Sequence, residues 1–255
     1  MKVLGKVMSV DKALIVLKLL AERGRDMKLT EISEELDINK CTLHGIISTL
    51  KFHGFVDQDE QTQKYRLGLY LIELGDITNK SLDIIRITTP IIEDVCNKLQ
   101  ETVHIGCLDG MDVVYVNKVE SKQSMRIFTS IGSRKPAYCT GLGKAMLAYL
   151  DEDKLNDLIP ESLVRYTNNT ITDRQKLIEN LKDIQKKGYA FDNEEVVEGL
   201  TCVAAPIFNH NGKAIYSMSI SGPTIRMTEE KINKSIELIK EAAEMISAKI
   251  GYSGQ

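Results

Sequence analysis

The sequence predicts an α+β protein made of a winged helix-turn-helix, a helical linker and a larger C-terminal domain. Three observations predict this fold class. Three short helical stretches with one sharp break come first, which is typical of a helix-turn-helix. Two extended stretches joined by a polar turn follow and supply a wing. The rest of the chain mixes strands and helices, as α+β sheet domains do. We expect domains at 1–68 and 89–255, with the linker at 69–88.

The first domain begins with three predicted helices. Ser9 can cap the first helix, and Gly24 can end it. A second, short helix follows Thr30. After a break at 37–39, the spacing predicts a third helix over about 40–53. The apolar stripe of this third helix consists of Leu43, Ile46, Ile47 and Leu50.

The wing and the linker follow directly. Extended residues at 55–58 and 64–67 flank the polar turn 59–63, which predicts a hairpin. From 68 to about 87 the apolar residues return to helical spacing. The apolar face of this linker needs a partner, either in the same chain or in a second subunit, so dimer contacts are expected here first.

The second domain is expected to open with a helix at Thr89-Pro90, a capping residue followed by proline. Strands at 102–108 and 113–119 flank the turn Asp109-Gly110, and a third strand is predicted at 125–130. The remaining predicted elements are helices at 141–150 and 173–187, strands at 202–208 and 214–221 with the turn Asn211-Gly212, and a long helix after Thr228.

Composition narrows the class of protein. The 255 residues are 43% hydrophobic and carry a formal net charge of −3, so the chain lacks the positive field of a nonspecific nucleic-acid coat. No apolar run is long enough to cross a membrane, and we expect a cytoplasmic protein without membrane partners. The five cysteines form no CxxC pair, so we expect them to be reduced packing residues. They are Cys41, Cys96, Cys107, Cys139 and Cys202.

Any DNA-binding surface must therefore be local, and the third helix is the candidate. Between Asp37 and Asp57 there is no carboxylate, so this stretch can approach phosphates without repulsion. Polar or small residues lie opposite the apolar stripe, where the N-terminal half of a recognition helix reaches base edges. Lys64 and Arg66 on the wing suit phosphates. The alternative is a merely solvated face. The candidates on the helix are Lys40, Cys41, Thr42, His44, Gly45 and Ser48.

Three segments of the second domain could bind a small ligand. Residues 140–144 open a helix with a capping hydroxyl and free N–H groups, although a tight turn into the helix explains them equally. Ser217, Ser219 and Ser221 alternate with apolar residues, so hydroxyls line either a polar pocket or a solvent-facing edge. The acidic residues at 192–195 could supply a binding carboxylate or form a hydrated loop.

Catalysis and metal binding find little support. His104 and His210 lie far apart in a chain without a Cys/His cluster, so neither a cofactor nor a metal is expected. A lone histidine in a strand is more often a structural residue than a ligand. A thiol hydrolase using Cys202 is the rival function, but nothing near it indicates a depressed pKa. A third reading makes the domain a pure oligomerisation module.

Four segments, in order and at matching spacing, make the chain resemble the IclR family of bacterial transcription regulators over essentially its full length. The first is 38–44 in the helix-turn-helix, and the second is 65–68 with Leu74-Gly75. The third runs from 101–104 through Asp109-Gly110 to Val114-Tyr115, and the fourth joins 141–145 with Gly188-Tyr189 to Cys202.

The resemblance implies a GAF-like effector-binding domain and no enzyme activity. It also implies dimers or tetramers on palindromic double-stranded operators, with small organic acids as effectors. We expect a repressor, with an activator as the alternative. Cys41 and Gly45 depart from the serine and arginine that many relatives carry, so no operator sequence carries over. By position in the family's motifs, the implied effector pocket consists of Ser124, Gly141, Leu142, Asp192, Cys202, Ser219 and Ser221.

Overall fold

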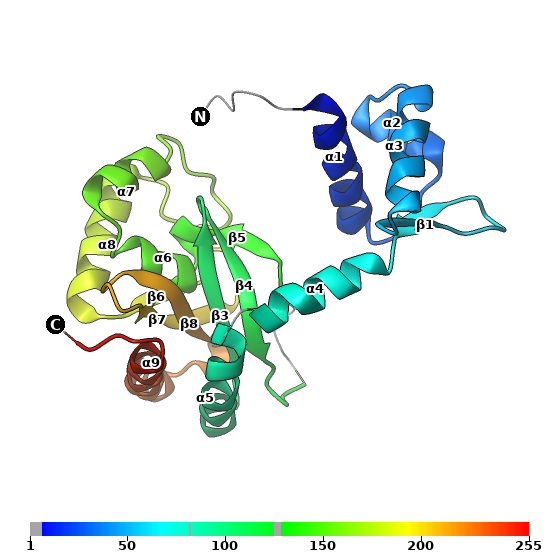
Figure 1. Ribbon diagram of the computed structural model, residues 1–255. Coiled ribbons are helices and arrows are strands. Elements are labelled where there is room, and N and C mark those ends of the chain that lie inside the picture. Colours follow the sequence, from blue (N-terminus) through cyan, green and yellow to red (C-terminus); the bar gives the residue numbers. More distant parts are fainter. Residues whose placement is uncertain (1–6, 82, 125–128, 255) are drawn as a thin grey trace. The chain divides into compact units, whose positions relative to one another are not determined.

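The computed structural model describes residues 7–81, 83–124 and 129–254 (Figure 1). The chain divides into two compact units, Met1–Leu82 and Asp83–Gln255. Each unit has a hydrophobic core of its own. Among the described residues, no helix is both long and apolar enough to cross a membrane.

The N-terminal unit contains the predicted helix-turn-helix and wing. Asp37 adopts a left-handed conformation (φ 51°) and ends one helix, and the Asn39 side chain accepts a hydrogen bond from Cys41 N (2.9 Å) to begin the next. Leu43, Ile47 and Leu50 are buried, as the stripe predicts. The elements are α1 (Met8–Arg23), α2 (Leu29–Leu36), α3 (Lys40–Phe52), β1 (Val56–Gln58), β2 (Tyr65–Leu67) and α4 (Tyr70–Ser81).

Two predicted helix starts in this unit are wrong by one or two residues. α1 starts at Met8 with Val7 at the N-cap, so Ser9 caps nothing. α2 starts at Leu29, before Thr30, because the Glu31 carboxylate reaches back to accept a hydrogen bond from Lys28 N (2.6 Å). Gly24 ends α1 as predicted, at φ 58°.

A helix start at Thr89-Pro90 is also wrong, because α5 (Asp83–Leu99) runs through this position with Pro90 inside it. The Thr88 and Thr89 hydroxyls do not cap a helix. They donate to the carbonyl oxygens of Ile84 (2.8 Å) and Ile85 (2.7 Å) one turn earlier. The stretch predicted as one linker helix thus contains α4 and the first turns of α5.

The C-terminal unit is built on one antiparallel sheet, which has six strands in the described residues, in the order β5-β4-β3-β8-β7-β6. Gly110 and Gly212 have φ values of 62° and 70° in the two predicted hairpin turns. Of the strand predicted at 125–130, residues 125–128 lie outside the described residues and 129–130 are not in a strand. The strands are β3 (Thr102–Asp109), β4 (Asp112–Val119), β5 (Arg134–Pro136), β6 (Ala190–Asn193), β7 (Leu200–Phe208) and β8 (Ala214–Pro223).

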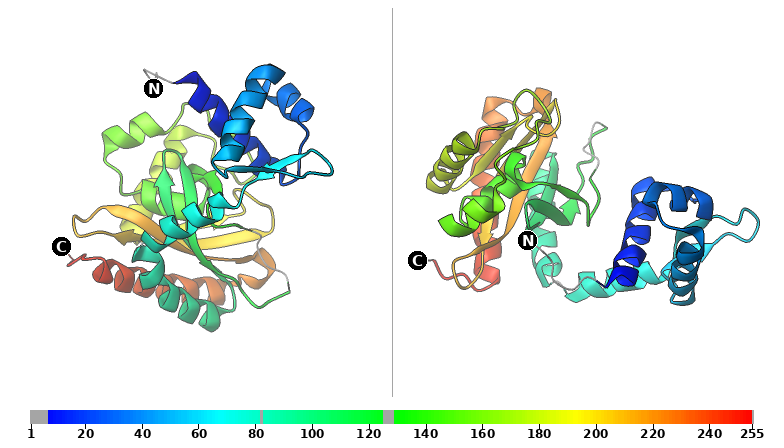
Figure 2. Two further views of the ribbon diagram at one scale, coloured as in Figure 1. Left: turned by 45° about the vertical axis from the view of Figure 1, so that its right-hand side comes forward. Right: turned by 90° about the horizontal axis from the view of Figure 1, so that it is seen from above.

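Helices cover both faces of this sheet (Figures 1 and 2). α5 and α9 pack against each other and against one face, whereas α6 covers the other, with α8 packed against α6. Asp173 caps α8 and Thr228 caps α9, each through its side chain, at the starts of the two helices that the sequence predicts. The α-helices of this unit besides α5 are α6 (Gly141–Leu147), α7 (Glu152–Leu158), α8 (Arg174–Lys187) and α9 (Glu229–Lys249). The space between the sheet and α6 contains the candidate pocket described next.

Candidate functional site

The outward side of α3 carries every helix residue that the sequence singled out for DNA. All six are exposed, opposite a stripe that is packed in the core of the unit. Thr42 and Gly45 also border an apolar groove formed with Val10 and Leu14 of α1. The six residues are Lys40, Cys41, Thr42, His44, Gly45 and Ser48.

On the wing, Lys64 directly precedes β2 and Arg66 is the middle residue of this strand. The Arg66 guanidinium bonds to Asp57 across the two strands, at 2.8 Å between Nη2 and Oδ2. Both partners are about half exposed (49% each), so this ion pair is weak and a phosphate can compete for the arginine. Phe52, which sequence reasoning missed, is 84% exposed at the C-terminal end of α3.

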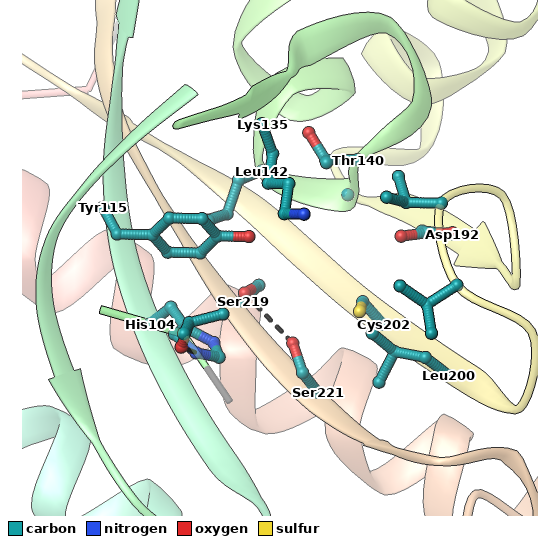
Figure 3. Close-up of a pocket in the computed structure, with 14 residues that line it drawn as sticks. His104, Tyr115, Lys135, Thr140, Leu142, Asp192, Leu200, Cys202, Ser219 and Ser221 are labelled. Carbon is teal, nitrogen blue, oxygen red and sulfur yellow. Dashed lines mark hydrogen bonds between the residues drawn. The ribbon is translucent and has the colours of Figure 1, made fainter. Parts of the chain in front are cut away.

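A pocket with a polar floor lies in the C-terminal unit between the sheet and the start of α6, with a volume of about 90 Å³ (Figure 3). The strand register builds its floor. One row across the sheet pairs Asp192 with Cys202, Cys202 with Ser221 and Ser221 with Thr102. Paired residues point to the same face of a sheet, so the polar side chains in this row face α6.

A second row lies beside the first. It pairs Ala204 with Ser219 and Ser219 with His104. β8 is a central strand, so the alternative of a solvent-facing serine edge is wrong. Ser219 and Ser221 are buried with their hydroxyl oxygens 3.5 Å apart, and Ser217 donates to the carbonyl oxygen of Leu142 (2.9 Å).

Gly141, the first residue of α6, lies over this floor, and the pocket is open there because glycine has no side chain. A Cβ at this position would lie 3.3 Å from the Cβ of Ala204, 3.6 Å from that of Cys202 and 3.8 Å from that of Asp192. The Thr140 side chain caps α6 by accepting from Gly143 N (3.2 Å). Glycine thus leaves open the space between α6 and the floor.

Burial shifts the pKa values of the acidic groups upwards. Desolvation raises the pKa of Asp192 to about 6, although its Oδ1 accepts a hydrogen bond from Glu195 N (2.9 Å). Desolvation, with Asp192 beside it, raises the pKa of the Cys202 thiol well above its ordinary value. A nucleophilic cysteine needs the opposite shift, so the geometry gives no support to a thiol hydrolase.

An ion pair lies buried behind the pocket. The Lys144 ammonium bonds to Glu195 and donates to the carbonyl oxygen of Phe191 (2.7 Å). The Lys144 and Glu195 side chains are only 1% and 6% exposed. This pair fixes α6 to the residues around β6, and with them the position of Asp192.

The pocket brings together six of the seven effector residues that the resemblance implied. Ser124 is not among the residues that line it, and its side chain is exposed. Sequence reasoning missed several lining residues, including His104, which it took for a structural residue, and Tyr115. Figure 3 shows the Lys135 side chain reaching from β5 towards the cavity. The other missed residues are Thr129, Val196, Val197 and Leu200.

His104 and Tyr115 are buried and meet edge to face, with ring centroids 5.1 Å apart. Burial lowers the pKa of His104 to about 3, helped by nearby Lys118, and raises the pKa of Tyr115. Both side chains are therefore neutral at physiological pH. Within residues 7–81, 83–124 and 129–254, no group of His, Cys, Asp and Glu side chains could hold a metal ion.

Comparison with known proteins covers both units. Residues 9–60 match the IclR helix-turn-helix domain, and residues 77–248 match the bacterial transcriptional regulator IclR C-terminal domain. The HTH-type transcriptional regulator KdgR of Escherichia coli is 36% identical, over 96% of this chain and 94% of its own.

Solved structures agree with these matches. The Thermotoga maritima IclR crystal structure is 35% identical, with a TM-score of 0.78 over 97% of this chain and 100% of its own. The IclR transcriptional regulator from Alicyclobacillus acidocaldarius is 32% identical, with a TM-score of 0.85 over 96% and 99%. The chain therefore belongs to the IclR family of DNA-binding transcription regulators, a family of regulators rather than enzymes.

Proposed function

We propose that this protein is a cytoplasmic repressor that binds palindromic operators as a homodimer or homotetramer, and that a small organic acid in the C-terminal pocket controls its affinity for DNA. The observation that carries the proposal is the polar, buried floor roofed by Gly141. A site with so many buried hydrogen-bonding groups suits a small polar ligand. Relatives that are named repressors, among them AllR of Salmonella at 30% identity, support repression rather than activation.

The organic acid is supported by the chemistry of the lining. The backbone N–H groups of Gly141 and Leu142, the serine hydroxyls and the Lys135 ammonium can hold one carboxylate. Asp192 can accept a hydrogen bond from a hydroxyl of the ligand. An IclR homologue with the same fold, from Microbacterium hydrocarbonoxydans and 20% identical, was crystallised with 4-hydroxybenzoate, itself a small acid.

DNA binding is proposed to use α3 for base edges and the wing for phosphates. The exposed residues Lys40, Thr42 and His44 lie in the N-terminal half of α3, the part of a recognition helix that enters the major groove. Lys64 and Arg66 then contact the backbone beside it. In this arrangement α3 recognises the base sequence, and the lysine and arginine residues of both α3 and the wing make the DNA affinity depend on salt concentration.

A homo-oligomer is supported by apolar side chains that the N-terminal unit leaves exposed. Leu14 on α1 is 53% exposed, and Ile72 and Ile77 on α4 are 69% and 56% exposed. A second copy would cover such residues in a two-fold assembly, and a two-fold protein reads a palindrome. Leu14→Glu should weaken self-association in sedimentation velocity, and unchanged association would remove α1 from the interface.

The experiment that tests this function is binding of the purified protein to DNA upstream of its own gene at two salt concentrations. We expect selective, salt-sensitive binding with a footprint that has two similar halves. Binding that is equal on unrelated DNA would contradict operator recognition. Calorimetry with a set of small organic acids tests the pocket separately, and a Gly141→Val variant supplies the negative control.

A further inference from the structure

His104 has a hydrogen-bonding atom that the protein does not satisfy. Its side chain is on the pocket floor, paired in register with Ser219, and the residue is 1% exposed. Nε2 is 2.8 Å from the Thr129 hydroxyl oxygen. Within the described part of the chain, the buried Nδ1 has no partner. Since buried polar atoms are nearly always hydrogen-bonded, an unpaired nitrogen on a residue that lines a pocket points to a partner group on a bound ligand.

The imidazole can offer a hydrogen bond in either direction, but no charge. Desolvation and the ammonium of Lys118 hold its pKa at about 3, and Glu120 opposes them only weakly. Because the Thr129 hydroxyl can donate to Nε2 or accept from it, Nδ1 can be a donor or an acceptor. A ligand hydroxyl pairs with both forms, and a carbonyl oxygen pairs with the donor form.

The rest of the pocket has charge for one carboxylate only. Among the described residues that line it, Lys135 is the single lysine or arginine, and it comes from β5. The Lys144 ammonium is occupied by Glu195 and Phe191 behind the pocket. The Lys118 ammonium near His104 is already bound to Glu120 and to the carbonyl oxygen of Thr129. A second carboxylate beside His104 would therefore be buried without a cation of its own, and the Asp192 carboxyl group on the floor would repel it.

We propose that His104 is a specificity-determining residue that hydrogen-bonds through Nδ1 to a hydroxyl or keto group of the effector, so that the pocket selects hydroxy- or keto-substituted monocarboxylates over dicarboxylates. This inference rests on the proposed control by an organic acid. It adds the class of acid and the residue that distinguishes it. Ser219 and Ser221 alone could not make that distinction, because hydroxyls bind carboxylates as readily as they bind hydroxyls.

The test is calorimetric titration near neutral pH with a matched five-carbon series. The probes are pentanoate, its 2-, 3-, 4- and 5-hydroxy derivatives, 4-oxopentanoate and glutarate. We expect at least one hydroxy or oxo acid to bind roughly tenfold or more tightly than both pentanoate and glutarate. In a His104→Leu variant that advantage should vanish, while pentanoate affinity changes by less than about threefold. His104→Asn, which keeps a hydrogen-bonding amide near the position of Nδ1, should retain part of the preference for hydroxy or oxo acids.

Three results would overturn the inference in distinguishable ways. If wild type prefers glutarate or pentanoate, or if His104→Leu keeps the selectivity, acids still bind the protein but His104 does not select them. If no acid binds, the proposed function fails with it. Thermal unfolding and operator binding by each variant check that the fold is intact.

A second measurement observes ligand binding on the wild-type protein. In ¹⁵N-histidine NMR, the Nδ1 signal of His104 should shift when the preferred acid binds, whereas the signals of His44 and His53 on the N-terminal unit should change less. The His104→Asn spectrum assigns the resonance. An acid that binds without moving the Nδ1 signal would contradict the contact.

Discussion

The two units use similar polar side chains in opposite environments. On α3, His44 and Ser48 are exposed on one helix, so their positions follow from local sequence alone. In the pocket, His104 and Ser219 are buried and come from different strands that pair across the sheet. Exposed groups can be changed with little effect on stability, whereas changes to buried groups alter ligand binding and folding together. The following predictions test this difference, from the largest expected effect to the smallest.

The largest effect is expected where the roof meets the floor. Gly141→Ala places a Cβ 3.3 Å from that of Ala204, and Gly141→Val adds two methyl groups to the same space. We expect Gly141→Ala to weaken acid binding and Gly141→Val to abolish it, a loss of roughly a hundredfold or more. Calorimetry measures both.

Gly75→Val is the matched control, because a Cβ at Gly75 on α4 meets nothing within 4 Å. This control should bind the acid like wild type. If Gly141→Val also binds normally, the pocket under α6 does not hold the ligand.

A smaller effect concerns stability and pH. The pKa of Asp192 is about 6 in the folded protein against an ordinary 3.8, so the folded state holds the proton more tightly than the unfolded state. Wild type therefore loses stability as pH rises from about 4 to 6, because a buried carboxyl must ionise. Asp192→Asn escapes this loss and should be more stable than wild type by roughly 1–3 kcal/mol above pH 6.

Urea unfolding at several pH values measures this difference. The advantage of Asp192→Asn should shrink towards zero near pH 4, while the exposed control Asp153→Asn shows no such trend. An advantage that is constant with pH would mean that ionisation of Asp192 is not its cause.

The linker supplies the next prediction. Ile77 is 56% exposed on α4, so its replacement removes little packing, but proline breaks the helix. We expect Ile77→Pro to bind the acid and to reduce the effect of the acid on operator affinity to near unity. A tenfold effect in wild type corresponds to about 1.4 kcal/mol of coupling. Ile77→Ala should keep that coupling, and full coupling in the proline variant would exclude α4 as the connection.

The smallest effect is expected on the exposed surface. Lys40→Ala at the start of α3 should weaken operator binding by a few-fold, lower the salt slope by about one, and leave stability unchanged. Lys182→Ala, on the exposed side of α8, is the matched control. Anisotropy titrations at several salt concentrations measure the slope, and an identical slope for both variants would remove Lys40 from the DNA interface.

These differences also explain how far the sequence could be interpreted. Helical periodicity and turn residues such as Gly24 act locally, so the helix-turn-helix and the hairpins could be predicted. Thr89-Pro90 was misleading because threonine followed by proline occurs both at a helix start and inside a helix. Inside α5 the Thr89 hydroxyl donates to a carbonyl oxygen of the previous turn and does not cap a helix. β6 was missed because it is only four residues long and ends in Asp192-Asn193.

The pocket could be predicted in part: the helix start at 140–144, the serine row and the acidic residues at 192–195 were candidates from their own chemistry, and the family's motifs joined them into one site. His104 was taken for a structural residue because its position beside Ser219 depends on the register of β3 with β8. Lys135 reaches the cavity from a three-residue strand that carries no clear pattern. Such long-range pairings are not visible in a single sequence, and they are what brings the polar floor together.

The most direct test of the central claim is a closed binding cycle. Operator affinity is measured with and without the preferred acid, and acid affinity is measured with and without operator DNA, both on the full chain. The proposed coupling predicts that the two affinities change by the same factor, because linkage is reciprocal. Two affinities that are each independent of the other ligand would contradict control of this regulator through its C-terminal pocket.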